Sequence, residues 1–133
     1  MDTYAEESMA TFRPEKIACA HTSCPVERTL AVIGGVWKTI LVRELLEGTR
    51  RYGQLRRMLP GVTHKVLTQQ LRELEVDGVV HRDVYAEVPP RVEYSLTPLG
   101  RELAPLLEGM HTWGERLAKA QRSTRDARER VSP

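Results

Sequence analysis

Residues 61–100 hold the pattern that most constrains the fold of this chain, a short amphipathic helix followed directly by two strand-like segments. Thr63 is a suitable N-cap for this helix after Pro60-Gly61, and Gly78 is a suitable residue to end it. At about 100° per residue, three leucines of this helix fall within roughly 60° of one another: Leu67, Leu71 and Leu74. Such a stripe predicts that one face of the helix packs on a hydrophobic core.

The opposite face of this helix carries polar and basic side chains: Lys65, Thr68, Gln69 and Arg72. Lysine and arginine suit phosphates or guanine edges, glutamine suits adenine, and threonine suits either a base or a phosphate. Every amphipathic helix also has a solvated polar face, so this pattern alone does not establish binding. The candidate DNA contacts on this helix are Thr63, His64, Lys65, Thr68, Gln69 and Arg72.

The distribution of charge favours nucleic-acid binding at that face. The whole chain is nearly balanced, with 20 Lys and Arg against 18 Asp and Glu. Residues 48–72 nevertheless contain no Asp or Glu, while their basic residues are Arg50, Arg51, Arg56, Arg57, Lys65 and Arg72. Localised positive charge drives affinity for phosphate and positions a protein on it, so we add Arg51 to the candidate contacts.

Three shorter helices are predicted upstream from the spacing of apolar residues: 25–33, 37–47 and 52–59. Gly34-Gly35 separates the first two, and Gly48 ends the second. Residues 59–63, Leu-Pro-Gly-Val-Thr, supply the turn before the helix that starts near Thr63. Two helices joined by such a turn predict a helix-turn-helix.

Downstream, residues 79–85 and 91–96 are rich in β-branched and aromatic residues, which predicts a two-stranded ribbon. The connecting tip contains Pro89-Pro90, which stiffens the loop and removes backbone donors. Arg82 and Arg91 flank this ribbon, as expected for a wing laid against DNA. The alternative for each arginine is an ordinary solubilising charge.

A long helix is predicted to begin at Thr97-Pro98, with the threonine as N-cap and the proline in the first helical position. Its apolar residues recur every three or four positions: Leu99, Leu103, Leu106, Met110, Trp113 and Leu117. Pro105 lies inside this run and should kink the helix. Because the preceding domain already has a core, we expect a dimerisation helix; the alternative is that it folds back on its own domain.

The sequence therefore predicts a mainly α fold with a small β-ribbon (α+β), a winged helix-turn-helix with a long C-terminal dimerisation helix. We expect a flexible N-terminal arm at 1–16, the winged helix-turn-helix domain at 17–121 and a charged, frayed or disordered tail at 122–133. No apolar run reaches transmembrane length, and no signal peptide is visible. The two cysteines fit a reducing cytosol, so we expect a cytoplasmic protein without a membrane partner.

Short motifs between residue 24 and about residue 118 are those of one known family: Cys24-Pro25-Val26, Val32-Ile33-Gly34-Gly35-Val36-Trp37, Leu59-Pro60-Gly61-Val62, the run from Lys65 to Glu75, Asp77-Gly78, the run from Val88 to Tyr94, and Leu96-Thr97. Together they resemble the HxlR-type winged-helix regulators, bacterial relatives of the MarR regulators. The resemblance implies a homodimeric transcription factor that binds double-stranded DNA at a palindromic operator. One departure is Val36, where the family commonly has a lysine.

The resemblance also gives Cys24 a candidate role, because some similar regulators sense electrophiles, quinones or oxidants through a thiol directly before the first helix. A thiolate there is stabilised by unpaired amide N–H groups and by the helix dipole. Cys19 is then a candidate resolving partner through an intrachain disulfide, although a bond across the dimer is also conceivable. The alternative is that Cys24 is a small, inert residue at the helix start.

Other chemistry finds little support in the sequence. Cys19, His21 and Cys24 form a Cys-x-His-x-x-Cys cluster that could hold zinc, but no fourth ligand has an obvious spacing, so we predict no metal and no cofactor. Because no phosphate-binding glycine loop, nucleophile elbow or metalloprotease helix is present, we predict that the protein is not an enzyme. The alternative to a DNA-binding regulator is a protein-interaction module that uses the winged fold without DNA.

Overall fold

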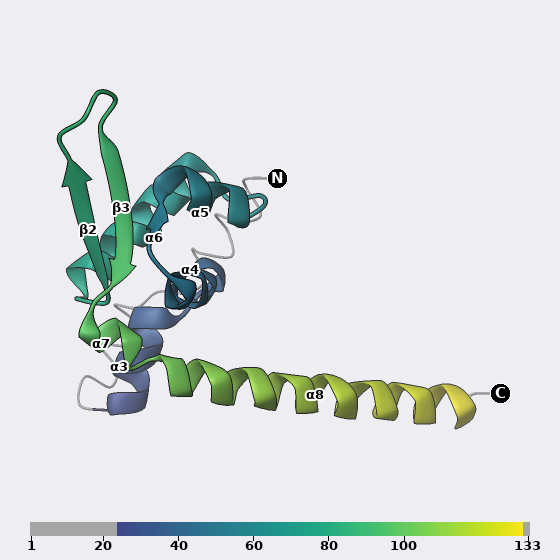
Figure 1. Ribbon diagram of the computed structural model, residues 1–133. Coiled ribbons are helices and arrows are strands. Elements are labelled where there is room, and N and C mark those ends of the chain that lie inside the picture. Colours follow the sequence, from purple (N-terminus) through teal and green to yellow (C-terminus); the bar gives the residue numbers. More distant parts are fainter. Residues whose placement is uncertain (1–23, 132–133) are drawn as a thin grey trace. The chain divides into compact units, whose positions relative to one another are not determined.

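The computed structural model describes residues 24–131 of the chain. In chain order its elements are α3 (Pro25–Ile33), α4 (Val36–Glu47), β1 (Arg50–Arg51), α5 (Tyr52–Met58), α6 (His64–Val76), β2 (Val80–Tyr85), β3 (Arg91–Leu96), α7 (Pro98–Arg101) and α8 (Ala104–Val131) (Figure 1). They divide into two compact units, one that ends at Arg101 and one that starts at Glu102 and contains α8.

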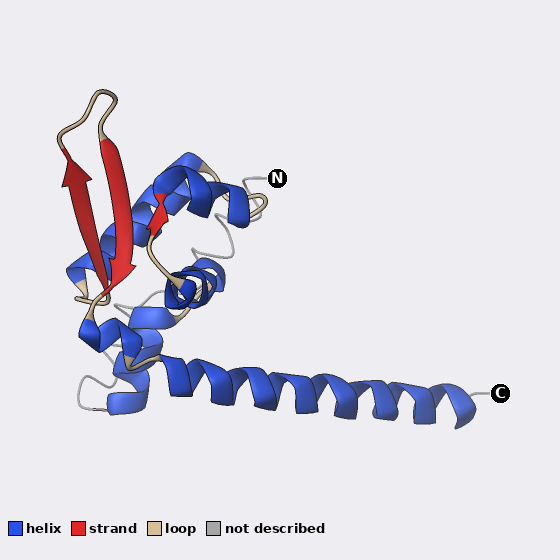
Figure 2. Ribbon diagram, viewed as in Figure 1, coloured by secondary structure: helices blue, strands red, loops and turns tan. Residues whose placement is uncertain are grey.

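The first unit combines its helices with a three-stranded antiparallel sheet in the order β1-β3-β2 (Figure 2). Strands β2 and β3 form the predicted ribbon, with Val80 opposite Leu96. The sequence did not predict β1, in which Arg50 lies opposite Tyr94 of β3. A strand of two residues is too short to show alternation, so its sequence carried no strand signal. The predicted winged helix-turn-helix architecture is otherwise confirmed.

Helix α6 buries its predicted leucine stripe in the core of the first unit. The side chains of Leu67, Leu71 and Leu74 are at most 1% exposed. The same core contains buried apolar residues of α4, of α5 and the residue after it, and of the sheet: Leu41, Val42, Leu45, Leu55, Leu59, Val80, Tyr94 and Leu96. Since burying one such side chain contributes about 1.5–3 kcal/mol, the stripe anchors α6 and leaves its opposite face to solvent.

Both predicted ends of α6 are confirmed. The Thr63 side chain accepts a hydrogen bond from the Val66 N–H at 3.1 Å, which caps the helix. At the other end Gly78 has a φ of 78°, a left-handed conformation that favours glycine. The N–H of Val79 then donates to the Leu74 carbonyl at 2.9 Å, closing the helix and directing the chain into β2.

The expectation of one long helix kinked at Pro105 is wrong. Helix α7 ends at Arg101, and a separate helix, α8, starts at Ala104 with Pro105 in its first turn. Proline lacks an N–H, and its ring clashes with the carbonyl four residues earlier, which here belongs to Arg101. The chain therefore interrupts the helix, and in the first turn of α8 the missing N–H costs nothing.

The second unit is dominated by α8, which continues for 28 residues to Val131. Residues 122–131, for which the sequence analysis expected a charged, frayed or disordered tail, belong to this helix. Opposite charges four positions apart favour this helix: Arg122 and Asp126, Arg125 and Glu129, Asp126 and Arg130.

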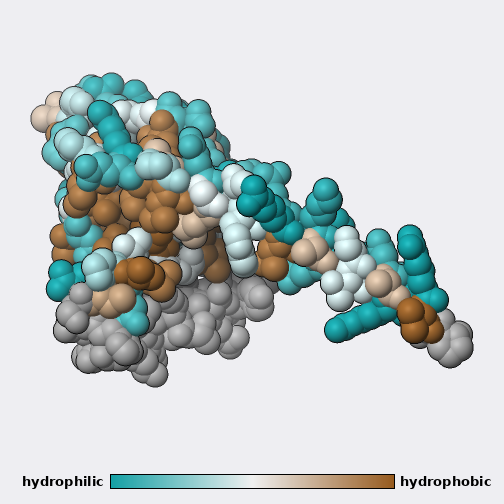
Figure 3. Space-filling model, turned by 90° about the horizontal axis from the view of Figure 1, so that it is seen from below, coloured by the Kyte–Doolittle hydropathy of each residue, from teal (hydrophilic) through white to brown (hydrophobic). Residues whose placement is uncertain are grey.

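Helix α8 leaves most of its apolar stripe exposed. Four of its large apolar side chains are 38–63% exposed: Leu106, Met110, Trp113 and Leu117. In the view of Figure 3 hydrophobic residues gather on the visible face of the first unit, whereas hydrophilic residues predominate along much of α8. No helix within residues 24–131 combines the length and apolar character needed to cross a membrane.

Candidate nucleic-acid interface

The connection between α5 and α6 is the tight turn that the sequence predicted. Helix α5 ends at Met58, and the following Leu59 N–H donates to the Leu55 carbonyl. Gly61 has a φ of 87°, and Val62 is only 8% exposed. The Val62 N–H donates to the Leu59 carbonyl at 3.2 Å. The buried valine attaches the turn to the core, so α5 and α6 form one helix-turn-helix unit.

Tyr52 joins the starts of these two helices. Its hydroxyl oxygen lies 2.5 Å from Nδ1 of His64, and the two rings meet edge to face with their centroids 5.3 Å apart. The sequence analysis did not anticipate this contact, because a partner across a turn leaves no periodic signal. His64 is exposed at the start of α6, and one of its ring nitrogens is already hydrogen-bonded to Tyr52.

The exposed face of α6 holds part of the predicted contact set. Three predicted side chains are exposed together on it: Lys65, Gln69 and Arg72. Thr68 is half-buried, and its hydroxyl oxygen is buried without a hydrogen-bond partner within the described structure. The Thr63 hydroxyl is engaged as the helix cap. The helical spacing thus predicted the exposed residues correctly but overestimated how far Thr68 reaches solvent.

Exposed arginines extend this basic surface beyond α6. Arg51 in β1 and both Arg56 and Arg57 in the last turn of α5 are exposed, whereas Arg50 is half-buried. Because residues 48–72 contain no acidic side chain, no carboxylate from this segment offsets their charge. A surface of this kind attracts an anionic partner.

The two arginines of the ribbon point to opposite faces of it. Directly opposed residues share a face of the sheet, and successive residues alternate. The strand register places Arg82 opposite Tyr94 and Arg91 opposite Tyr85, so the arginines lie on different faces. Arg82 is exposed although it shares its face with the buried Tyr94.

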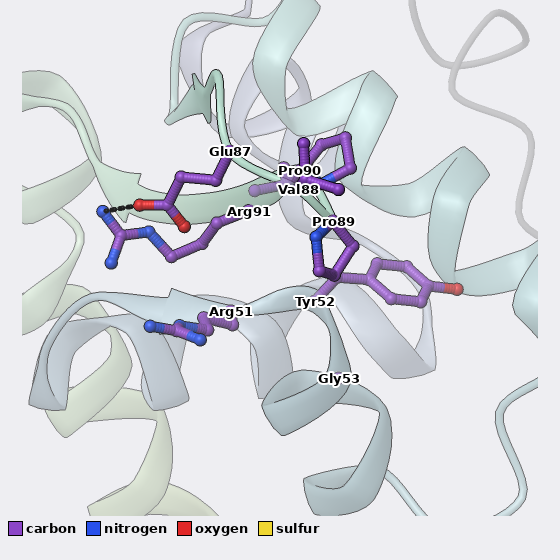
Figure 4. A pocket seen from close by; sticks show the side chains of 9 residues that line it. Arg51, Tyr52, Gly53, Glu87, Val88, Pro89, Pro90 and Arg91 are labelled. Atoms are coloured by element: carbon purple, nitrogen blue, oxygen red, sulfur yellow. Dashed lines mark ion pairs between the residues drawn. The ribbon is translucent and has the colours of Figure 1, made fainter.

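Arg91 already has partners within the ribbon. Its guanidinium carbon lies 4.2 Å from the centroid of the Tyr85 ring, and its nitrogens lie 3.4 Å from Glu87 and 3.6 Å from Glu93. A pocket of about 390 Å³ lies between the loop that joins β2 to β3 and the start of α5. Figure 4 shows Arg91 and Glu87 on one side of this pocket and Arg51 on the other. A phosphate would have to replace these carboxylates for Arg91 to bind DNA.

One lysine is buried where α4 meets α6. Lys38 is 3% exposed, and its Nζ lies 2.6 Å from Oε2 of Glu73. The pKa of the nearby Asp77 carboxyl is raised, mainly because it is partly removed from water and also because of Glu73, while Lys38 opposes the rise. The spacing of apolar residues that predicted this helix did not identify Lys38 as buried.

Cys24 is the residue directly before α3 and occupies its N-cap position. It is half-buried and carries a free thiol. Cys19 and His21, which the sequence grouped with it, lie outside the described residues, so neither the disulfide nor the zinc cluster can be located. Within residues 24–131, no group of three or more His, Cys, Asp or Glu side chains is arranged to hold a metal ion.

The chain belongs to the HxlR-like helix-turn-helix family, whose model matches residues 32–122. It is 56% identical to the uncharacterized HTH-type transcriptional regulator YybR of Bacillus subtilis, over 69% of this chain and 74% of that protein. The solved structure of the redox regulator HypR in its reduced form is similar, with a TM-score of 0.71, 52% identity and coverage of 75% of this chain and 99% of HypR.

A MarR-family transcriptional regulator from Porphyromonas gingivalis W83 is also similar, with a TM-score of 0.66, 36% identity and coverage of 70% of this chain and 91% of that one. These proteins confirm the family and the winged-helix class that the sequence predicted. Family members of this type are transcriptional regulators and not enzymes.

Proposed function

We propose that this chain is a sequence-specific, DNA-binding transcriptional regulator that acts as a homodimer on a palindromic operator in the cytoplasm. The observation that carries the proposal is the exposed basic face of α6 beside the ribbon, in a segment without acidic side chains. In this proposal α6 enters the major groove, with His64, Lys65, Gln69 and Arg72 toward the DNA and Thr63 and Thr68 at the edge of the contact. Arg51 contacts the flanking backbone.

An electrophoretic mobility shift tests this function, with DNA from upstream of the protein's own and neighbouring reading frames as probes. A shift that survives an excess of unrelated DNA is the expected result. The alternative function is a winged-helix protein-interaction module without DNA binding. It would be favoured if no probe shifted at low salt, where electrostatic binding to DNA is strongest.

We expect a two-fold homodimer that uses the exposed apolar stripe of α8. A dimer would space two copies of α6 about 34–36 Å apart, which is one turn of DNA. Light scattering at micromolar concentration should therefore give twice the mass of one 15.1 kDa chain. A monomer that still binds its operator one to one would contradict the dimer.

We expect Arg82 and Arg91 to contact the DNA backbone or the minor groove beside each half-site. Their opposite faces allow the ribbon to meet the DNA edge on, and Arg91 would exchange Glu87 and Glu93 for a phosphate. In a hydroxyl-radical footprint, Arg82→Ala and Arg91→Ala should each remove protection at the flanks of the site. If the flanks and the affinity stay unchanged, the two arginines only solubilise the ribbon.

We propose further that Cys24 is a reactive thiol whose modification by a small electrophile or oxidant changes DNA affinity. Its position before α3 and the likeness to the redox regulator HypR support this role. Alkylation should modify Cys24 faster than an ordinary thiol, and diamide or quinone treatment should alter the operator shift of wild type but not of Cys24→Ser. A treated wild-type protein that binds DNA as before would remove the sensor role and leave the regulator.

A further inference from the structure

Glu73 connects the buried side of α6 to its exposed side. Its Oε2 lies 2.6 Å from the Nζ of Lys38, whose side chain is 4% exposed. Its Oε1 accepts a hydrogen bond of 3.4 Å from the side-chain amide of Gln69, one turn earlier on the helix. The Glu73 side chain itself is 41% exposed. One carboxylate therefore bridges a group fixed in the core and an exposed side chain of the proposed DNA-binding face.

The burial of Lys38 determines which way the Glu73 carboxylate points. A buried ammonium without a partner is strongly unfavourable, so Lys38 keeps Glu73 turned toward the core. The Gln70 amide adds a second hydrogen bond to the same Oε2, at 3.5 Å. With Oε2 occupied in this way, the rotamer of Glu73 is restricted, and Oε1 remains turned toward Gln69.

The hydrogen bond to Glu73 leaves available the groups of the Gln69 amide that are needed to hydrogen-bond to a base. The amide nitrogen has two hydrogens, and Glu73 uses one of them. The other hydrogen of that nitrogen and the Oε1 of Gln69 itself form the donor and acceptor pair that matches adenine. An amide held in place before binding loses less conformational entropy when it binds. In addition, the charge of Lys38 offsets that of Glu73, which would otherwise repel DNA phosphates.

We propose that Lys38 is a positioning residue for base recognition, because it holds Glu73, and Glu73 in turn orients the Gln69 amide toward an adenine edge. This inference rests on the proposed binding of DNA through α6. Lys38 is buried and cannot itself reach the DNA. In this proposal it nevertheless contributes to the choice of the DNA sequence that the protein binds.

The test uses the full chain and two probes. One is the duplex that wild-type protein enriches from randomised DNA of about 30 base pairs, long enough for two half-sites one turn apart. The other is a scrambled duplex of the same composition. The variant Lys38→Met/Glu73→Leu replaces the ion pair by apolar side chains, a change that folded proteins often tolerate.

We expect this variant to lower the ratio of selected to scrambled affinity by about tenfold, the effect of losing one base contact. Its affinity for the scrambled duplex and the salt dependence of that affinity should stay the same, since no phosphate contact is removed. Glu75→Leu, which removes an exposed carboxylate from the same helix, is the matched control and should leave the ratio unchanged.

A double-mutant cycle separates positioning from a purely structural effect. Gln69→Ala should lower the ratio as much as Lys38→Met/Glu73→Leu does, and the combined variant should show no further loss. Additive losses would overturn the proposal, because the buried pair would then act through the fold and not through Gln69.

A second measurement needs no variant. In ¹⁵N-labelled wild-type protein without DNA, the order parameter of the Gln69 side-chain amide should approach the value of about 0.85 that is typical of rigid backbone, and a value below about 0.6 would overturn the proposal. If wild type enriches no duplex, the proposed function fails and this inference with it. If wild type enriches one and the variant keeps the ratio, only the positioning role is overturned.

Discussion

Gly100→Ala should destabilise the first unit by about 3 kcal/mol, the upper part of the range for overpacking a tight site. A Cβ on Gly100 would overlap the backbone carbonyl oxygen of Val79 and lie 3.2 Å from Cδ2 of Leu96. Neither neighbour can easily yield. The Val79 carbonyl accepts the Thr97 N–H at 3.1 Å, and the Val79 N–H is held by Leu74 at 2.9 Å. The strain would therefore spread into the end of α6 and the start of β2.

Urea unfolding followed by circular dichroism measures this loss, at one fixed protein concentration because the proposed dimerisation would contribute to apparent stability. Gly109→Ala in α8 is the matched control, since a Cβ there meets nothing within 4 Å. It should stabilise the helix by about 0.5–1 kcal/mol. If Gly100→Ala unfolds at the same urea concentration as wild type, the contact between α7 and the start of β2 must be adjustable, contrary to this expectation.

The parts of the fold that the sequence predicted are those determined by local patterns. The stripe of Leu67, Leu71 and Leu74 repeats at helical spacing, so it identified both α6 and the face that is buried. The caps at Thr63 and Gly78 depend on single residues and their immediate neighbours, so they could also be located in advance. The exposed set Lys65, Gln69 and Arg72 followed from the same helical geometry.

The parts that were missed depend on partners distant in the sequence. The β1 strand exists only because Arg50 and Arg51 meet β3, more than 40 residues later. Tyr52 meets His64 across a turn, and Lys38 meets Glu73 between two helices. A lysine beside Trp37 gives no local sign that it will be buried. Pro105 was a different error: its local effect was anticipated, but a break was mistaken for a kink.

The double substitution Gln69→Ala/Arg72→Ala should lower operator affinity by about 2–6 kcal/mol, since each base-reading side chain contributes about 1–3 kcal/mol. Both side chains are exposed on the face of α6 opposite its buried leucines. Removing them should therefore leave the fold intact, which thermal unfolding can verify. The loss should fall on the operator and spare scrambled DNA, because base contacts carry sequence information that phosphate contacts do not. Competition between the two duplexes at a fixed salt concentration measures this difference.

Lys65→Ala tests the other half of the assignment. If Lys65 contacts a phosphate, its removal should weaken binding to all sequences alike and reduce the salt slope by about 1. Lys119→Ala, which removes the same charge from α8, is the matched control and should change neither quantity.

If the Gln69→Ala/Arg72→Ala variant binds its operator with full affinity, then α6 does not read the bases, even though it belongs to a helix-turn-helix. The basic residues outside α6, with Arg51 first among them, would then be the next candidates for the contact.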